Sequence, residues 1–108
     1  MNKLALGTVQ FGIKYGINNS HGIPSDKAVD EILNFANKSG VKIIDTAIAY
    51  GNCEERLGIL MKNDFDIISK FSNVVNEKDL KKSLNQTLNK LKISKLYGFL
   101  AHDSNQLI

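Results

Sequence analysis

At residues 41–51 the chain reads Val-Lys-Ile-Ile-Asp-Thr-Ala-Ile-Ala-Tyr-Gly. Its first five residues form a short apolar run that ends in an acid, which is typical of a buried strand with a polar group at its carboxyl end. Residues 65–70 and 97–102 repeat this pattern and end in Lys70 and His102. The carboxyl ends of successive parallel strands meet at one rim of an α/β barrel. We therefore expect Asp45, Lys70 and His102 to converge there, together with Tyr50 from the loop after the first of these strands.

Strand-like and helix-like segments alternate along the whole chain. Strands are expected at residues 4–8, 41–45, 65–70 and 96–101. Helices are expected from Ser25 or Asp26 to Ser39, over residues 54–62, and from Asn76 onward. A long glycine-bearing loop, with Gly12, Gly16 and Gly22, separates the first strand from the first helix. This alternation predicts a parallel sheet built from βαβ units.

The apolar residues of two expected helices recur at the helical period. In the first helix we expect one buried stripe, and in the helix from Asn76 we expect a row of leucines to face the core. These positions are Ala28, Val29, Ile32, Leu33, Phe35 and Ala36 in the first case, and Leu80, Leu84, Leu88 and Leu91 in the second.

The number of strand–helix steps sets the expected architecture. A complete eight-stranded barrel needs roughly 250 residues, whereas this chain has 108. We predict an α/β fold that forms the N-terminal half, about four βα units, of a (β/α)8 TIM-type barrel, as a single domain over residues 1–108. Two possibilities stay open: a piece of a longer protein, or a small open sheet with helices on both faces.

Composition indicates an ordinary globular protein. Hydrophobic residues make up 43% of the chain and charged residues 23%, and no apolar run is long enough to span a bilayer. The apolar part of the N-terminus is too short for a secretory signal. The single cysteine, Cys53, excludes an internal disulfide and fits a reducing cytosol. We therefore expect a cytoplasmic protein.

The excess of positive charge is small. The net charge is +3, Arg56 is the only arginine, and the lysines are spread along the chain. The densest group of lysines lies within residues 78–95, where a solvated helix face explains it better than a nucleic-acid site. Neither Cys53 nor His21 shows metal-ligand spacing. We expect no nucleic-acid partner and no metal.

Four landmarks in the sequence resemble the aldo-keto reductase family. They are Leu-Gly-Thr-Val-Gln-Phe-Gly at residues 6–12, Ile-Asp-Thr-Ala-Ile-Ala-Tyr-Gly-Asn-Cys-Glu-Glu-Arg-Leu-Gly at 44–58, Ile-Ser-Lys at 68–70, and the helix-then-strand stretch at 88–102. The third resembles the strand that delivers the family's lysine, and the fourth the elements that deliver its histidine. Because the landmarks occur in the right order over essentially the whole chain, the resemblance is more specific than one short motif.

The resemblance implies an NADPH-dependent reduction of aldehydes or ketones to alcohols. In the family, a tyrosine gives the proton to the carbonyl oxygen, a lysine and an aspartate support it, and a histidine orients the substrate. These roles would fall to Tyr50, Lys70, Asp45 and His102. The chemistry is consistent, since an ammonium beside a phenol favours the phenolate and a hydrogen-bond donor at the carbonyl stabilises developing negative charge. Taken singly, each of these residues also has an ordinary structural explanation.

The first strand ends in candidate cofactor contacts. In the family this turn lies close to the nicotinamide ribose, so the resemblance implies that Gly7, Thr8 and Val9, with Asp45, contact NADPH; a simple glycine turn is the alternative. No G-x-G-x-x-G follows a strand, so the Rossmann mode of binding is not indicated. Family members bind the adenosine and phosphate parts with the second half of the barrel. We therefore expect the 108 residues alone to be a poor or inactive reductase.

Two functions of other classes stay open. One is a non-enzymatic half-barrel module that self-associates through its open strand edges. The other is a flavodoxin-like phosphate-binding module, which is disfavoured because no phosphate-cradling glycine-rich turn immediately precedes a helix. The opening sequence is similar to bacterial reductases, some of which are associated with surface-sugar metabolism. A sugar-like carbonyl is therefore one candidate substrate.

Overall fold

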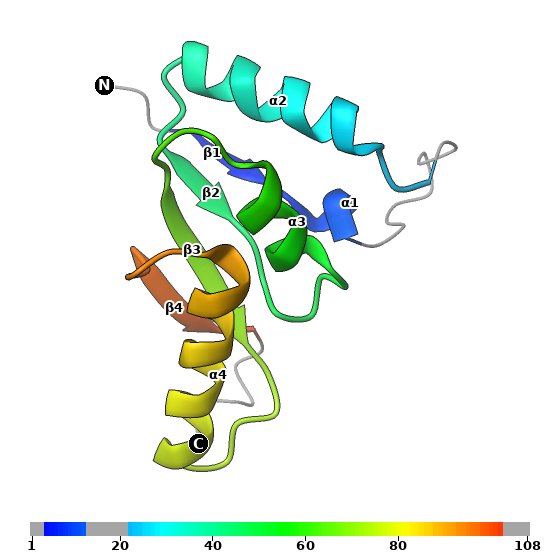
Figure 1. The fold of residues 1–108 in the computed structure, drawn as a ribbon. Helices are drawn as coiled ribbons and strands as arrows, with labels where there is room; N and C mark the ends of the chain where they lie inside the picture. Colours follow the sequence, from blue (N-terminus) through cyan, green and yellow to red (C-terminus); the bar gives the residue numbers. More distant parts are fainter. Residues whose placement is uncertain (1–3, 13–21, 103–108) are drawn as a thin grey trace.

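The computed structural model describes residues 4–12 and 22–102, which form one parallel sheet and its connecting helices (Figure 1). The strands pair in the order β1-β2-β3-β4, and every pair is parallel. Gly16 and His21 lie outside the described residues. The elements are β1 (Ala5–Gly7), α1 (Val9–Gly12), α2 (Asp26–Lys38), β2 (Ile43–Asp45), α3 (Cys53–Leu60), β3 (Asp66–Phe71), α4 (Glu77–Leu91) and β4 (Gly98–Ala101).

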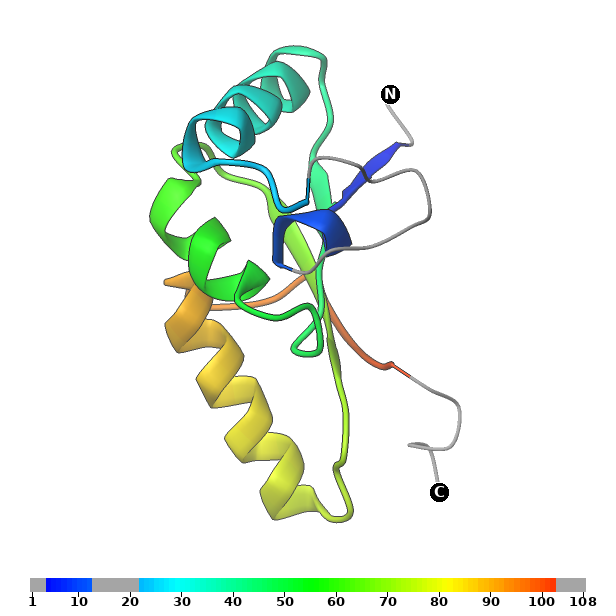
Figure 2. The same cartoon turned by 90° about the vertical axis from the view of Figure 1, so that its right-hand side faces the viewer.

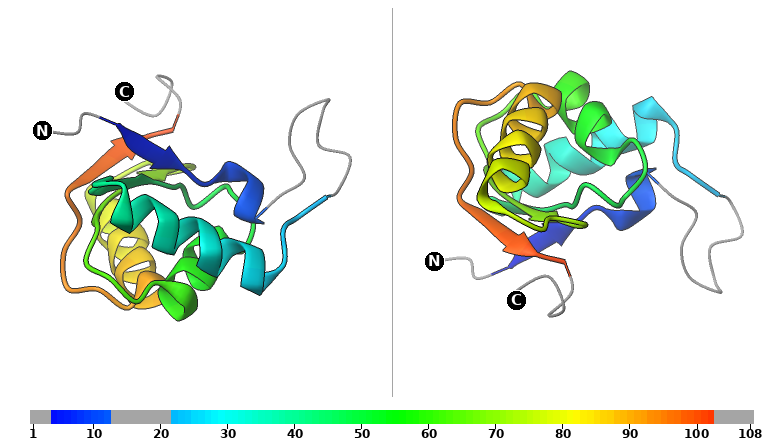
Figure 3. Two further views of the ribbon diagram at one scale, coloured as in Figure 1. Left: turned by 90° about the horizontal axis from the view of Figure 1, so that it is seen from above. Right: turned by 90° about the horizontal axis from the view of Figure 1, so that it is seen from below.

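The longer helices cover one side of the sheet. Figure 2 shows α2, α3 and α4 together on that side, and both views in Figure 3 place β1 and β4 on the side away from them. Side chains in register alternate between the two faces of a sheet. The residues that point toward the helices form the core, as the aligned Leu6, Ile44 and Ile67 illustrate: Ile44 is 0% exposed and Ile67 2%.

The other side of the sheet is covered by no helix of the described residues. We call it the open face, and its members follow from the strand register: Ala5, Gly7, Ile43, Asp45, Asp66, Ile68, Lys70, Gly98 and Leu100. Consecutive parallel strands with all long helices on one side are the arrangement of an α/β barrel, where the opposite side lines the interior. A sheet with helices on both faces is not seen in the described part of the chain.

The structure corrects the expected start of the fold. The loop after the first strand contains a short helix, α1, which closes with a bond of 2.9 Å from the Phe11 amide to the Thr8 carbonyl. A single turn is too short to produce a helical pattern in the sequence. Its Phe11 is 5% exposed and belongs to the core. This turn fills the space between the end of β1 and α3.

Helix α2 begins as predicted but buries a narrower stripe. The Ser25 hydroxyl accepts from the Ala28 amide at 3.2 Å, which is the expected cap. The buried residues are Val29, Leu33 and Ala36, whereas Phe35 is 73% exposed. At about 100° per residue, position 35 lies roughly 120° around the helix from Val29. The prediction that Phe35 belongs to the buried stripe was therefore wrong, and Ile32, which is 37% exposed, also lies outside that stripe.

Helix α4 also begins at its predicted cap. The Asn76 side chain accepts from the Asp79 amide at 2.8 Å. Leu91 is buried and the other leucines of the predicted row are half-buried. The helix approaches α3 closely at Gly58, where an added Cβ would lie 2.0 Å from the Lys90 carbonyl oxygen. Only a glycine permits this contact between the two backbones.

Candidate active site

Lys70 occupies the carboxyl end of β3 and binds two oxygens from the neighbouring strand end. Its Nζ donates to the Asp45 carboxylate, and to the Thr46 carbonyl oxygen at 2.9 Å. The Lys70 side chain is 17% exposed and that of Asp45 43%. Both residues lie on the open face. The lysine of the pair is therefore largely shielded from water, whereas the aspartate stays accessible. The predicted Asp45–Lys70 pair is present.

Tyr50 reaches the same ammonium from the loop between β2 and α3. Lys70 Nζ lies 3.4 Å from the Tyr50 hydroxyl oxygen and 5.0 Å from the centre of its ring. The loop is held at both ends, since the Ile48 amide donates to the Lys70 carbonyl at 3.1 Å and the Cys53 amide to the Tyr50 carbonyl at 3.1 Å. The backbone therefore keeps the phenol beside the lysine.

His102 completes the group from the end of β4. Its amide donates to the Phe71 carbonyl at 3.0 Å, which extends the pairing of β3 with β4 by one residue. Its ring lies edge-on to that of Tyr50, with ring centres 5.6 Å apart and planes at 86°. The side chain is exposed. The four residues singled out in the sequence thus meet at one edge of the sheet, as expected.

The three candidate cofactor contacts at the end of β1 and directly after it lie in different surroundings. Gly7 is exposed on the open face and aligned with Asp45. Thr8 is 1% exposed, and its hydroxyl donates to the Asp45 carbonyl at 2.8 Å. Val9 is half-buried at the start of α1. Of the three, only Gly7 is exposed, and it lies next to Asp45, the aspartate that binds Lys70.

Cys53 packs beneath the site with two threonines. It is 0% exposed, its sulfur accepts from the Thr46 hydroxyl at 3.2 Å, and it lies 3.1 Å from the Thr8 hydroxyl oxygen. Burial raises the pKa of the Cys53 thiol above its ordinary value, and the Thr46 and Thr8 hydrogen bonds lower it less. A thiol that is buried and held neutral is a structural group.

Glu54 is a residue whose position the sequence did not reveal. The sequence placed it at the start of the helix expected over residues 54–62, where an acid is favoured. It lies in the first turn of α3, but the residue is buried, at 3% exposure. It accepts from the Ser69 hydroxyl at 2.6 Å and from the Thr87 hydroxyl at 3.0 Å. Its partners lie on β3 and α4, so the sequence around residue 54 does not predict them.

Arg56 was noted only as the sole arginine, and it joins α3 to the start of the chain. Its guanidinium donates to the Phe11 carbonyl at 2.6 Å and the Pro24 carbonyl at 2.9 Å, and it pairs with the Asp26 carboxylate at 2.7 Å. These bonds engage both terminal nitrogens of the group. Arg56 therefore links α3 to α1 and to the start of α2.

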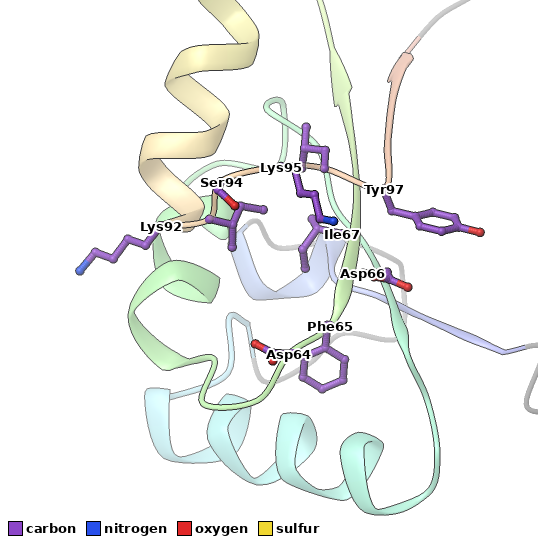
Figure 4. A pocket seen from close by; sticks show the side chains of 10 residues that line it. Asp64, Phe65, Asp66, Ile67, Lys92, Ser94, Lys95 and Tyr97 are labelled. Carbon is purple, nitrogen blue, oxygen red and sulfur yellow. The ribbon is translucent and has the colours of Figure 1, made fainter.

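A pocket of about 730 Å³ lies at the opposite end of β3 from Lys70. Figure 4 shows its walls, which come from the start of β3 and from the connection between α4 and β4. The lining includes carboxylates and ammonium groups, among them Asp64, Asp66, Lys92 and Lys95. In α/β barrels, chemistry takes place at the carboxyl ends of the strands, and the amino ends serve stability. The pocket is therefore not part of the candidate active site.

Within residues 4–12 and 22–102, no helix is both long and apolar enough to cross a membrane. No group of three or more histidine, cysteine, aspartate or glutamate side chains in these ranges could hold a metal ion.

Fold and site together define an α/β protein of barrel type, with lysine, aspartate and histidine at the carboxyl ends of the strands and a tyrosine in the loop after β2. The sequence matches the model of the Aldo/keto reductase family over residues 3–106. The chain therefore belongs to the aldo/keto reductase family, which supports an oxidoreductase. The comparison with curated proteins gives no match.

Solved structures show which part of the family's fold is present. A Pseudomonas aeruginosa protein provisionally assigned as an aldo-keto reductase is 32% identical, with a TM-score of 0.78, over 93% of this chain and 42% of its own. A second P. aeruginosa structure with the same assignment is 31% identical, with a TM-score of 0.75, over 93% and 41%. The chain thus spans less than half the length of these proteins. The predicted N-terminal part of an aldo-keto reductase barrel is confirmed.

Proposed function

We propose that the protein containing these residues reduces the carbonyl group of a small aldehyde or ketone to an alcohol with NAD(P)H. The observation that carries the proposal is the position of the Lys70 ammonium, 3.4 Å from the Tyr50 hydroxyl and bonded to the Asp45 carboxylate. The family resemblance favours NADPH over NADH. The single cysteine, which is free and buried, fits a cytoplasmic location.

Tyr50 would donate the proton to the carbonyl oxygen. As the proton leaves, negative charge develops on the phenol oxygen, and the neighbouring Lys70 ammonium stabilises it. Asp45 and the Thr46 carbonyl hold that ammonium in place by accepting two of its three hydrogens. The third hydrogen is directed toward Tyr50, so the lysine acts on the phenol without leaving its own partners.

His102 would orient the substrate. Its ring is exposed and its centre lies 5.6 Å from that of the Tyr50 ring, so one carbonyl group would be within reach of both side chains. A carbonyl oxygen placed between them accepts from both groups. The imidazole hydrogen bond becomes stronger as charge builds up on that oxygen, which lowers the barrier for reduction.

The surroundings of Gly7 fit the nicotinamide end of the cofactor. An added Cβ at Gly7 would find no atom within 4 Å, and Asp45 lies opposite it in the sheet register. The exposed backbone of Gly7 therefore leaves room for a flat ring beside Asp45, where Val9 and the buried Thr8 would shape the turn from behind. When bound, NAD(P)H supplies the hydride.

Replacing Tyr50 by phenylalanine tests the proposal, in the protein expressed from its full reading frame. The change removes one oxygen, so kcat for carbonyl reduction should fall by about 100-fold or more while NADPH binding is preserved. Tyr97→Phe is the matched control, because Tyr97 is 65% exposed and lies just before β4. Turnover of Tyr50→Phe at the wild-type rate would refute the mechanism.

A second candidate function is a module that pairs with a second copy of itself. The observation that favours it is the open face, whose outer strands β1 and β4 each pair with one neighbour among the described residues, and whose Leu100 is 54% exposed. Sedimentation equilibrium of the 108-residue chain discriminates. A dimer that Leu100→Glu dissociates and Ile59→Glu, on the far side in α3, leaves intact would support self-association. A monomer with a cooperative melt would argue against it.

A further inference from the structure

A buried carboxylate connects the segment that carries Tyr50 with the strand that carries Lys70. Glu54 lies in the first turn of α3, four residues after Tyr50. Its Oε2 accepts from Ser69 Oγ at 2.6 Å, and Ser69 directly precedes Lys70 in β3. The Thr87 hydroxyl of α4 donates to the same carboxylate at 3.0 Å and 3.3 Å. One side chain therefore holds α3, β3 and α4 together.

Burial of the Glu54 carboxylate between α3, β3 and α4 has a cost in free energy. Burying a carboxylate is unfavourable unless hydrogen bonds compensate for lost water, and apolar residues of similar size often pack as well or better. The start of α3 offsets part of the cost, because the helix dipole favours an acid there. Unlike an apolar side chain, the carboxylate makes directional contacts. Its hydrogen bonds to Ser69 and Thr87 fix where β3 and α4 lie relative to α3.

The relative position of β3 and α3 matters because the loop with Tyr50 is bonded to β3 at its start and to α3 at its end. At its start, the Thr46 amide donates to the Ile68 carbonyl at 2.8 Å and the Ile48 amide to the Lys70 carbonyl at 3.1 Å. At its end, the Cys53 amide donates to the Tyr50 carbonyl at 3.1 Å. The Glu54–Ser69 bond adds a direct link between α3, which follows the loop, and β3, to which the start of the loop is bonded.

We propose that Glu54 is a positioning residue that sets the separation of Tyr50 from Lys70 through Ser69. Without the Glu54–Ser69 bond, α3 can move relative to β3 and takes the loop with it. The 3.4 Å contact between the Lys70 ammonium and the Tyr50 hydroxyl then lengthens for part of the time. The effect on turnover rests on the proposed reduction, whereas the effect on geometry does not.

Residue-resolved amide hydrogen exchange tests the geometric part without any activity. Glu54→Leu removes both hydrogen bonds, Glu54→Gln retains an oxygen that can accept from Ser69 and Thr87, and Ser69→Ala serves if Glu54→Leu fails to fold. The Ile48 amide should exchange about tenfold faster in Glu54→Leu and Ser69→Ala. The Asp66 amide, bonded to the Lys42 carbonyl at 2.8 Å at the other end of β3, should not change. Unchanged exchange at Ile48, or equal acceleration at both amides, would overturn the proposal.

Kinetics of the full-length protein test the link to catalysis. In Glu54→Leu and Ser69→Ala, kcat should fall by about tenfold with the NADPH dissociation constant unchanged, and Glu54→Gln should restore it. The control is Glu55→Gln, an exposed acid in the same helical turn. Wild-type kcat in a variant whose Ile48 amide has lost protection would overturn the catalytic link. Wild-type turnover in Tyr50→Phe would instead refute the proposed reduction and leave the exchange result standing.

Discussion

Lys70 and Tyr50 come from different elements, yet the lysine nitrogen lies 3.4 Å from the phenol oxygen. Asp45 holds the lysine from the other side. Asp45→Asn keeps an acceptor for the ammonium but removes the opposite charge, so Lys70 should become less firmly held. We expect kcat for carbonyl reduction to fall by about tenfold, the order of one charge-assisted hydrogen bond.

Steady-state kinetics of Asp45→Asn and Asp66→Asn provide this measurement and its control. Asp66 is an exposed aspartate of the open face at the opposite end of β3. Its replacement should leave kcat unchanged. Equal rates in the two variants would show that the negative charge of Asp45 has no part in the reaction.

Removal of the His102 ring should impair catalysis while folding stays intact. The bond that joins residue 102 to β3 comes from its backbone amide, and the side chain is exposed. His102→Ala should therefore melt at the wild-type temperature but lose about 100-fold in kcat/KM for the carbonyl substrate. His102→Gln, which restores an N–H donor, should recover part of the loss. A variant with full kcat/KM would exclude His102 from substrate binding.

Replacement by alanine should affect stability at Gly12 and cofactor binding at Gly7. At Gly12 the added Cβ would lie 1.6 Å from the Tyr50 carbonyl oxygen, so the backbone has to move. Gly12→Ala should destabilise the protein by about 1–3 kcal/mol or more. At Gly7 no atom lies within 4 Å, so Gly7→Ala should melt like the wild type and weaken NADPH binding. Thermal melts and fluorescence titration separate the two effects, and a wild-type melt for Gly12→Ala would contradict the close contact.

Cys53 should make stability depend on alkaline pH. Burial raises the pKa of its thiol in the folded protein, whereas in the unfolded chain the thiol ionises near its ordinary value of about 8.5. The contribution of the neutral buried thiol is therefore fully present below that pH and is lost as the pH rises toward the folded pKa. Urea unfolding at neutral and alkaline pH should show a larger loss of stability for the wild type than for Cys53→Ala. The same loss in both would contradict the expected linkage.

The sequence predicted which side chains of the candidate site lie together better than it predicted the packing around them. Asp45, Lys70 and His102 follow short apolar runs, and a local pattern of this kind defines where a strand ends. Glu54 depends on Ser69 and Thr87, which are 15 and 33 residues away, so its burial is a property of the tertiary structure. The first turn after β1 was missed because one turn of helix has no period.

The extent of the buried stripe on α2 also lay beyond sequence reasoning. A helical pattern shows which apolar residues share a side, but how wide a face the sheet covers depends on where the helix lies. Phe35 was included for its apolar character, and it is 73% exposed. Polar residues at strand ends are thus more informative from sequence than the outer members of an apolar stripe.

The most direct test of the account is a double-mutant cycle on Tyr50 and Lys70. Kinetics of carbonyl reduction would be measured for Tyr50→Phe, Lys70→Met and the double variant in the full-length protein. If the lysine acts through the phenol, the double variant should be no slower than Tyr50→Phe alone, because residues that act as a unit are not additive. Losses that multiply in the double variant would show that the two side chains act independently, and would contradict the proposed pairing.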